Sequence, residues 1–273
     1  MTSSVGTVPD LAGVLDLLRG RTLVVLTGAG LSTDSGIPDY RGPGSPNRTP
    51  MTFQEFRSGA QAQRRYWARS HLGWSRMGGA VPNAGHHALA RLEPALLITQ
   101  NVDGLHEQAG SRSMVALHGR IADVICLDCR AVTSRARLQA RMDAANPGFA
   151  AAHAEAATRP DGDVELEQTE GFVVPDCEDC GGSLKPDVVF FGENVPAPRV
   201  ERCYAAVDAL PDEGALLVAG SSLTVMSGFR FVRRAAKAGV PVVIVNRGAT
   251  RGDELATCKV DAGCSEFLTE LAG

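Results

Sequence analysis

A short apolar segment that runs directly into a glycine turn constrains the fold of this chain more than any other feature. Residues 23–26, Leu-Val-Val-Leu, are apolar and rich in β-branched side chains, which indicates a strand buried in a parallel sheet. Gly28 and Gly30 follow, and glycine allows the backbone to turn sharply and approach a ligand. Free backbone N–H groups beyond such a turn suit phosphate binding. Thr33 stands where the pattern G-x-G-x-x-G needs its third glycine, so a purely structural turn stays open.

Three further apolar segments have the same buried character, and polar residues follow each of them. They are residues 95–99, 215–219 and 241–245, which lead into residues 100–103, 220–222 and 246–248. Helical segments separate them, including one predicted over residues 230–238, and strands that alternate with helices form a parallel, doubly wound sheet. Because ligands bind at the carboxyl ends of such strands, the sequence predicts a binding site at this edge.

Four of the seven cysteines form two Cys-x-x-Cys pairs, Cys126 with Cys129 and Cys177 with Cys180. Four thiolates suit Zn²⁺ in a closed tetrahedral site, so the sequence predicts one structural zinc ion. The segment between the pairs, residues 130–176, is longer than a simple zinc ribbon needs and has room for a helix. A redox-active pair and unrelated free thiols are the rival interpretations.

Composition and charge exclude several classes of protein. The 273-residue chain carries a net charge of −4 and no basic block, so electrostatics gives no case for binding nucleic acid or a membrane surface. No apolar run approaches the ~18 residues that span a bilayer. The first residues have neither the charged nor the apolar region of a secretion signal. With an odd number of cysteines, these features predict a soluble protein of a reducing compartment, the cytoplasm.

Several motifs together resemble one enzyme family. GAGLSTDSGIPDYRG, residues 28–42, resembles the opening motif of the sirtuins, the NAD-dependent protein-lysine deacylases. TQNVDGLH (99–106), LHG (117–119), the two cysteine pairs, KPDVVFFGE (185–193), GSS (220–222) and NRG (246–248) follow in the family's order. The resemblance runs from about Asp10 to the C-terminus. The segment RRYWARSHLGW, residues 64–74, also resembles the class II branch, whose animal member is mitochondrial.

The resemblance implies that NAD is a co-substrate and indicates which residues hold it. They are Gly28, Ala29, Gly30, Ser32, Asp39, Tyr40, Arg41, Gln100, Asn101, Val102, Asp103, Gly220, Ser221, Ser222, Asn246, Arg247, Gly248 and Cys264. Within this set, Asn101 and Asp103 are expected to hold the nicotinamide ribose and carboxamide. Cys264 is expected to lie beside the adenine and to act through its backbone.

The resemblance also implies the reaction. His118 matches the catalytic histidine, with Asn101 as a second catalytic residue. A lone histidine at a strand end is more often structural, but its near-neutral pKa suits general-base work. In the implied reaction the acyl oxygen of an acyl-lysine protein or peptide attacks the nicotinamide ribose, and nicotinamide leaves. His118 then helps to activate a ribose hydroxyl, and the further products are free lysine and O-acyl-ADP-ribose.

The resemblance further implies that two segments hold the peptide between them, where main-chain hydrogen bonds would bind it. Their residues are Phe191, Gly192 and Glu193 on one side, and Leu223 and Val225 on the other. Plain burial is the other interpretation of residues 188–191, which are apolar on both faces. Tyr66 and Arg69 resemble a pair with which some sirtuins hold the carboxylate of an acidic acyl group, a role that a phenol and a guanidinium suit. Core packing is the alternative for Tyr66.

The expected organisation is a Rossmann-like NAD-binding domain and a small domain in two parts. The first comprises residues 1–50, 78–120 and 188–273; the helical part of the small domain comprises residues 51–77 and the zinc-binding part residues 121–187. Thr52 and Glu55 form a capping-box pattern at the start of the helical part. The active site is expected in the cleft between the two domains.

Three other functions stay open. An NAD-dependent zinc dehydrogenase would need an open zinc position and an acidic residue about 20 residues past the glycine turn. A zinc-ribbon binding module without catalysis would leave residues 100–103 and His118 unexplained. A protein ADP-ribosyltransferase on the same scaffold would use the same NAD site.

Overall fold

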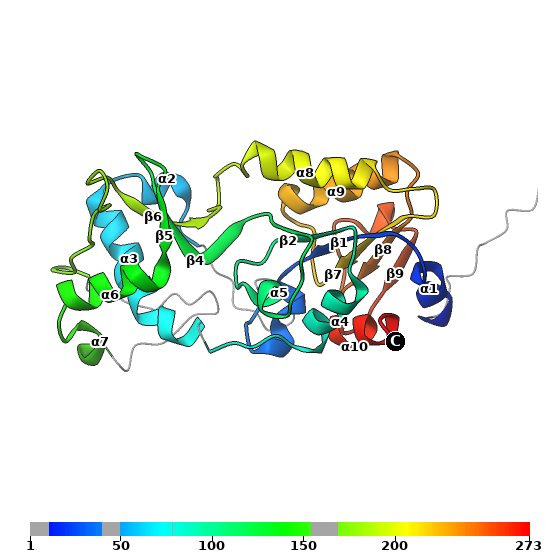
Figure 1. Cartoon of the computed structure of the whole chain (residues 1–273), viewed down its shortest axis with the longest axis horizontal. Helices are drawn as coiled ribbons and strands as arrows, with labels where there is room; N and C mark the ends of the chain where they lie inside the picture. Colours follow the sequence, from blue (N-terminus) through cyan, green and yellow to red (C-terminus); the bar gives the residue numbers. More distant parts are fainter. Residues whose placement is uncertain (1–10, 40–49, 78, 154–168) are drawn as a thin grey trace, which may run out of the picture.

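The structure is a computed structural model that describes residues 11–39, 50–77, 79–153 and 169–273. Tyr40 and Arg41, both expected to bind NAD, lie outside the described residues. The described residues form two sheets with their helices, a large parallel sheet and a small antiparallel one (Figure 1).

The large sheet has six parallel strands in the order β3-β2-β1-β7-β8-β9. Its strands are β1 (Leu23–Thr27), β2 (Leu96–Thr99), β3 (Met114–Ala116), β7 (Ala215–Ala219), β8 (Val242–Val245) and β9 (Cys258–Val260). The apolar segment before the glycine turn forms β1 near the centre, where Val25 is in register with Leu97 on one side and Leu217 on the other. The predicted parallel sheet is confirmed.

Helices cover both faces of this sheet because alternate residues of each strand point to opposite sides. Val25 and Leu97 face a core that they share with three helices, and Val24 and Ile98 face a second core on the other side. The first group is α1 (Leu11–Leu18), α4 (Ala84–Leu92) and α10 (Cys264–Leu271), and the second is α8 (Ala197–Asp208) and α9 (Met226–Lys237). Figure 1 shows α8 and α9 above the sheet, and α4 and α10 below it. The sheet is therefore doubly wound, as predicted.

Apart from the short helix α5 (Leu105–Gln108), which packs on α4, and three short 3₁₀ segments, the remaining described elements form a second unit, which we call the small module. Its antiparallel sheet has the order β5-β4-β6 and consists of β4 (Gly119–Cys126), β5 (Val132–Ser134) and β6 (Leu184–Val188). Its helices are α2 (Phe53–Phe56), α3 (Ala60–Met77), α6 (Arg135–Ala145) and α7 (Phe149–Ala152), on the left in Figure 1. Thr52 caps α2 by accepting a hydrogen bond from the Glu55 N–H at 3.1 Å, as the capping-box pattern predicted. The exact domain boundaries stay predictions.

A buried guanidinium joins the helices of the small module. The Arg135 guanidinium lies over the rings of Trp67 and Trp74, at 5.3 and 4.8 Å from the ring centroids, and donates to the Ser70 carbonyl at 3.1 Å. Burial lowers the pKa of Arg135 to about 10, so the group stays charged at neutral pH. Trp67 is fully buried and its indole N–H donates to the Leu184 carbonyl at 3.0 Å, which ties α3 to β6. Trp67 is thus a core residue.

The turn after β1 packs backbone against backbone on the turn after β7. The Gly30 N–H donates to the Gly220 carbonyl at 2.8 Å, and Gly28 donates to Ala219 at 3.1 Å. A Cβ atom on Gly28 would lie 2.7 Å from the Gly220 carbonyl oxygen, closer than Cβ atoms approach such atoms. Gly220 has φ +68°, a conformation that glycine adopts without strain. The two turns can therefore meet only because these positions are glycine.

Substituting Gly28→Ala is expected to lower the free energy of unfolding by about 1–3 kcal/mol, because the added methyl must push a backbone carbonyl away. Urea unfolding followed by circular dichroism measures the change. Gly263→Ala is the matched control, since its Cβ would meet a flexible arginine tip at 3.1 Å rather than backbone. Equal stabilities of the two variants would contradict this account of the turn.

Candidate active site

A cavity of about 680 Å³ lies at the carboxyl ends of the parallel strands. Most of the residues expected to hold NAD line it. They are Gly28, Ala29, Gly30, Asp39, Gln100, Asn101, Val102, Gly220, Ser221, Ser222, Asn246, Arg247 and Gly248. The ends of β1, β2, β7 and β8 thus contribute to one cavity, and its volume suits a ligand of dinucleotide size.

His118 lies in the same cavity and is held at both ring nitrogens. Its Nδ1 lies 2.9 Å from the Gln100 carbonyl oxygen, which can only accept, so Nδ1 carries the hydrogen. Its Nε2 lies 2.7 Å from the Ser227 hydroxyl. Burial lowers the pKa of His118 to about 4, against the smaller opposing effect of the Gln100 contact. The imidazole is therefore neutral at pH 7, with the lone pair on Nε2.

A buried hydrogen-bond network fixes Asn101. The Asn101 amide donates to the Ser32 hydroxyl at 2.9 Å and to the Gly28 carbonyl at 3.1 Å. Ser32 in turn donates to the Asp103 carboxylate at 2.7 Å. Ser32 and Asp103 are not among the described residues that line the cavity. They form the network that holds Asn101, and the direct contact with NAD expected of them stays a prediction.

The two expected peptide segments line the cavity together. Phe191, Gly192 and Glu193 contribute from one loop, and Leu223 and Val225 from the other. The Glu193 carboxylate accepts from the Phe190 N–H at 2.9 Å and pairs with the buried Lys185 ammonium at 3.0 Å, which anchors the first loop. The alternative of plain burial is wrong for Phe191, whose side chain is 41% exposed beside the nearly buried Phe190. Phe191 lies within the turn that Phe190 and Glu193 close by hydrogen bonds, with its ring exposed.

Besides Ser32 and Asp103, three expected NAD or acyl-group residues in the described part of the chain are absent from the cavity lining: Tyr66, Arg69 and Cys264. The Tyr66 ring packs 5.2 Å from the ring of Phe190, and Phe190 itself lines the cavity. Cys264 begins α10, is buried, and directs its thiol toward the Val245 carbonyl at 3.7 Å. Burial raises the pKa of the Cys264 thiol to about 12, so it stays protonated.

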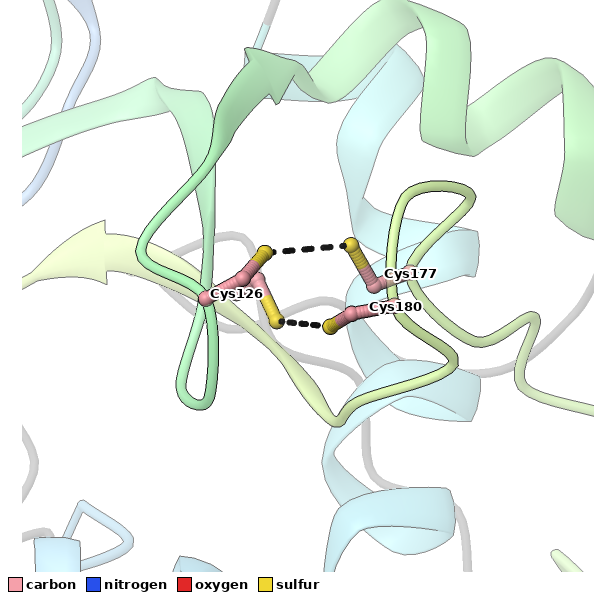
Figure 2. A group of neighbouring side chains, drawn as sticks. Cys126, Cys177 and Cys180 are labelled. Carbon is pink, nitrogen blue, oxygen red and sulfur yellow. Dashed lines mark hydrogen bonds between the residues drawn. The ribbon is translucent and has the colours of Figure 1, made fainter.

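The four cysteines of the two pairs come together in the small module. Their sulfur atoms all lie within 4.8 Å of one another, with 3.5 Å between Cys126 and Cys180 and 3.8 Å between Cys129 and Cys177. Figure 2 shows Cys126, at the end of β4, and Cys177 and Cys180, from the turn before β6, with their side chains pointing toward a common centre. A tetrahedron with Zn–S bonds of about 2.3 Å has S···S edges of about 3.8 Å, so the cluster fits one zinc ion. All four positions are thiolates, which suits a structural site.

Comparison with known proteins places these features in a family. The model of the Sir2 family matches residues 28–227. The chain is 55% identical over 271 residues to NAD-dependent protein deacetylase 1 of Mycobacterium avium (strain 104), covering 97% of this chain and 94% of that protein. It is 54% identical to NAD-dependent protein deacetylase 1 of Streptomyces coelicolor (strain ATCC BAA-471 / A3(2) / M145), with 96% and 89% covered. The chain belongs to the Sir2 family.

Solved sirtuin structures have the same fold as this chain. A structure described as Sir2 bound to acetylated peptide has a TM-score of 0.76 at 28% identity, covering 96% of this chain and 97% of that one. Another, described as Sir2-p53 peptide-NAD+, has a TM-score of 0.75 at 29% identity with the same coverage. The family and the four-cysteine cluster together confirm the expected NAD and single zinc ion for this sirtuin.

Sequence reasoning missed several cavity residues of this sirtuin. Ser227 and Arg230 line the cavity from α9, and Asn194 lines it from the glutamate loop. The helix predicted over residues 230–238 in fact begins at Met226 and ends at Lys237. Gly228 lies in this first turn, where a Cβ would lie 2.5 Å from the Gln100 side-chain oxygen, so glycine favours the close packing of α9 on Gln100. The first turn of α9 thus reaches the cavity.

Replacing Cys177 with Ala is expected to reduce bound zinc from one ion per chain to nearly none, because three ligands no longer complete the tetrahedron. Elemental analysis of the purified protein measures the content, and limited proteolysis reports loosening of the small module. Cys203→Ala, a buried cysteine of α8 outside the cluster, is the control and keeps its zinc. Retention of wild-type zinc by Cys177→Ala would contradict the assignment.

Three histidines whose pKa is lowered predict the acid sensitivity of the fold. Burial lowers the pKa of His86 and His118 to about 4 and that of His106 to about 3. The unfolded chain therefore binds more protons below pH 6.5, and stability is lost as the pH falls from 6.5 toward 4. Each histidine adds about 1.4 kcal/mol per pH unit to the slope. His106→Gln should reduce the pH dependence of the free energy of unfolding by about this amount. Urea unfolding between pH 4.5 and 6 measures it, and an unchanged pH dependence would contradict the prediction.

Proposed function

We propose that this sirtuin removes acetyl groups from lysine side chains of proteins and consumes NAD in doing so. The observation that carries the proposal is the neutral His118 imidazole, which lies in one cavity with the four strand ends and both expected peptide segments. Two similarities to other proteins support it: relatives at 55% and 54% identity are named NAD-dependent protein deacetylase 1, and a structural neighbour is described as bound to acetylated peptide.

In this proposal NAD, the co-substrate, occupies the part of the cavity formed by the strand ends. The glycine turn of residues 28–30 lies near its phosphates, because a glycine turn after a parallel strand lets a ligand approach the backbone closely. The N–H groups of Gly28 and Gly30 themselves donate to Ala219 and Gly220 and hold the turn in place. Asn101, held by Ser32 and Gly28, provides a rigid amide for the nicotinamide ribose. The loop that carries Asn246 and Gly248 serves the adenosine half, together with the backbone of Cys264.

His118 acts as the general base. Its Nε2 holds the lone pair, because the Gln100 carbonyl keeps the hydrogen on Nδ1. A neutral imidazole at pH 7 is ready to accept a proton from a ribose hydroxyl, whereas an imidazolium is not. NAD supplies the electrophilic carbon and the leaving group of the reaction, and the protein orients it and takes the proton.

The acetyl-lysine peptide lies between the two loops that line the cavity. Phe191 offers an exposed ring at one edge, and Met226, 40% exposed, offers an apolar side chain near the other. The Lys185–Glu193 ion pair holds the Phe191 loop in place. An extended peptide bound through its main chain would confer weak sequence selectivity.

Longer or acidic acyl groups are a further part of the proposal. The contact between Tyr66 and Phe190, with ring centroids 5.2 Å apart, supports it, because it places the Tyr66 ring against a residue that lines the cavity. We also propose that the chain belongs to the class II branch and is located in the cytoplasm. Within the described ranges, none of the helices is long and apolar enough for a bilayer crossing.

His118→Ala is expected to lower deacetylation by about 10²–10⁴-fold, the usual contribution of a general base, while the zinc content stays at one ion. Mass spectrometry of an acetyl-lysine peptide incubated with NAD measures the product; succinyl, glutaryl and longer-chain lysine peptides rank the acyl preference. His87→Ala, an exposed histidine of α4, is the control. Full deacetylation activity in His118→Ala would contradict the mechanism. ADP-ribose attached to protein without deacetylation would favour the protein ADP-ribosyltransferase function.

A further inference from the structure

The base nitrogen of His118 already has a hydrogen-bond partner in the protein. Because Nδ1 donates to the Gln100 carbonyl, the neutral ring has one acceptor site, the in-plane lone pair of Nε2. The Ser227 hydroxyl lies 2.7 Å from that nitrogen and must be the donor of the pair. A substrate hydroxyl therefore finds the lone pair occupied.

Ser227 is placed where a proton from the cavity can reach His118. It lies in the first turn of α9, is 8% exposed, and lines the cavity together with His118. A serine oxygen that donates its own hydrogen keeps two lone pairs with which it can accept another. Gln100 fixes Ser227 and His118 relative to each other. Gly228, the residue after Ser227, packs on the Gln100 side chain, and the Gln100 carbonyl holds the His118 imidazole.

We propose that Ser227 relays the proton from the substrate hydroxyl to His118, an inference that rests on the deacetylase function proposed above. The substrate O–H bond breaks as an Oγ–H bond forms on Ser227. The original Ser227 hydrogen passes at the same time to Nε2 of His118. The electron pair stays on the substrate oxygen, Ser227 ends neutral, and His118 ends as the cation. Ser227 thus takes part in the same step as the base.

The hydrogen-bond direction can be tested in the zinc-loaded protein without NAD. In ¹⁵N-labelled protein at pH 7, the His118 resonances, identified by their loss in His118→Gln, should show a protonated Nδ1 and an unprotonated Nε2. This tautomer requires Ser227 to donate. A hydrogen on Nε2 would make Ser227 the acceptor and overturn the relay.

Kinetics separate the relay from the earlier chemistry. Exchange of labelled nicotinamide into NAD, in the presence of the acetyl-lysine peptide, reports the departure of nicotinamide and needs no ribose deprotonation. Ser227→Ala should keep this exchange within twofold of wild type and lower single-turnover deacetylation by about tenfold or more. Ser227→Cys, which keeps a transferable proton, should give an intermediate rate. Ser58→Ala, an exposed serine that bonds its own turn, should match wild type in both assays.

The outcomes distinguish the relay from the function on which it rests. Wild-type rates of deacetylation in Ser227→Ala would overturn the relay alone. Equal losses of exchange and deacetylation in Ser227→Ala would also overturn it, because they indicate a binding role. A wild-type protein that neither exchanges nicotinamide nor releases lysine would overturn the proposed function, and the relay with it.

Discussion

The close approach of two glycine turns is the constraint on which the rest of the structure depends. Gly30 donates to Gly220 across the ends of β1 and β7, at a distance that leaves no room for a side chain on Gly28. With the backbones in contact, the polar residues that follow β2 and β8 border the same cavity. A larger residue at either turn would separate the two central strand ends and disperse the site.

Gln100 links this scaffold to the reacting groups. Its carbonyl holds His118, its side-chain amide donates to the Ser221 hydroxyl at 2.7 Å, and its side chain packs on Gly228. The end of β2, the turn after β7 and the start of α9 therefore meet at one residue. Such a junction fixes the direction of the imidazole without any charged partner, which agrees with the neutral state that burial imposes on His118.

The sequence was informative where a pattern has one physical interpretation. Apolar strand segments gave the parallel sheet, and cysteine spacing gave the four-thiolate cluster. It failed where tertiary contact decides: the helix predicted over residues 230–238 begins at Met226, so Ser227 in its first turn went unnoticed. The supporting position of Ser32 and the aromatic contact of Tyr66 likewise depend on residues distant in sequence, which periodicity and spacing do not report.

The stoichiometry of the reaction tests the central claim most directly. Zinc-loaded protein would be incubated with NAD and an acetyl-lysine peptide, and nicotinamide, free lysine and the acetylated product would be quantified together by mass spectrometry. The account predicts one nicotinamide for each lysine released, with the acetyl group on ADP-ribose. Lysine release without NAD, or acetate as the first product, would contradict it.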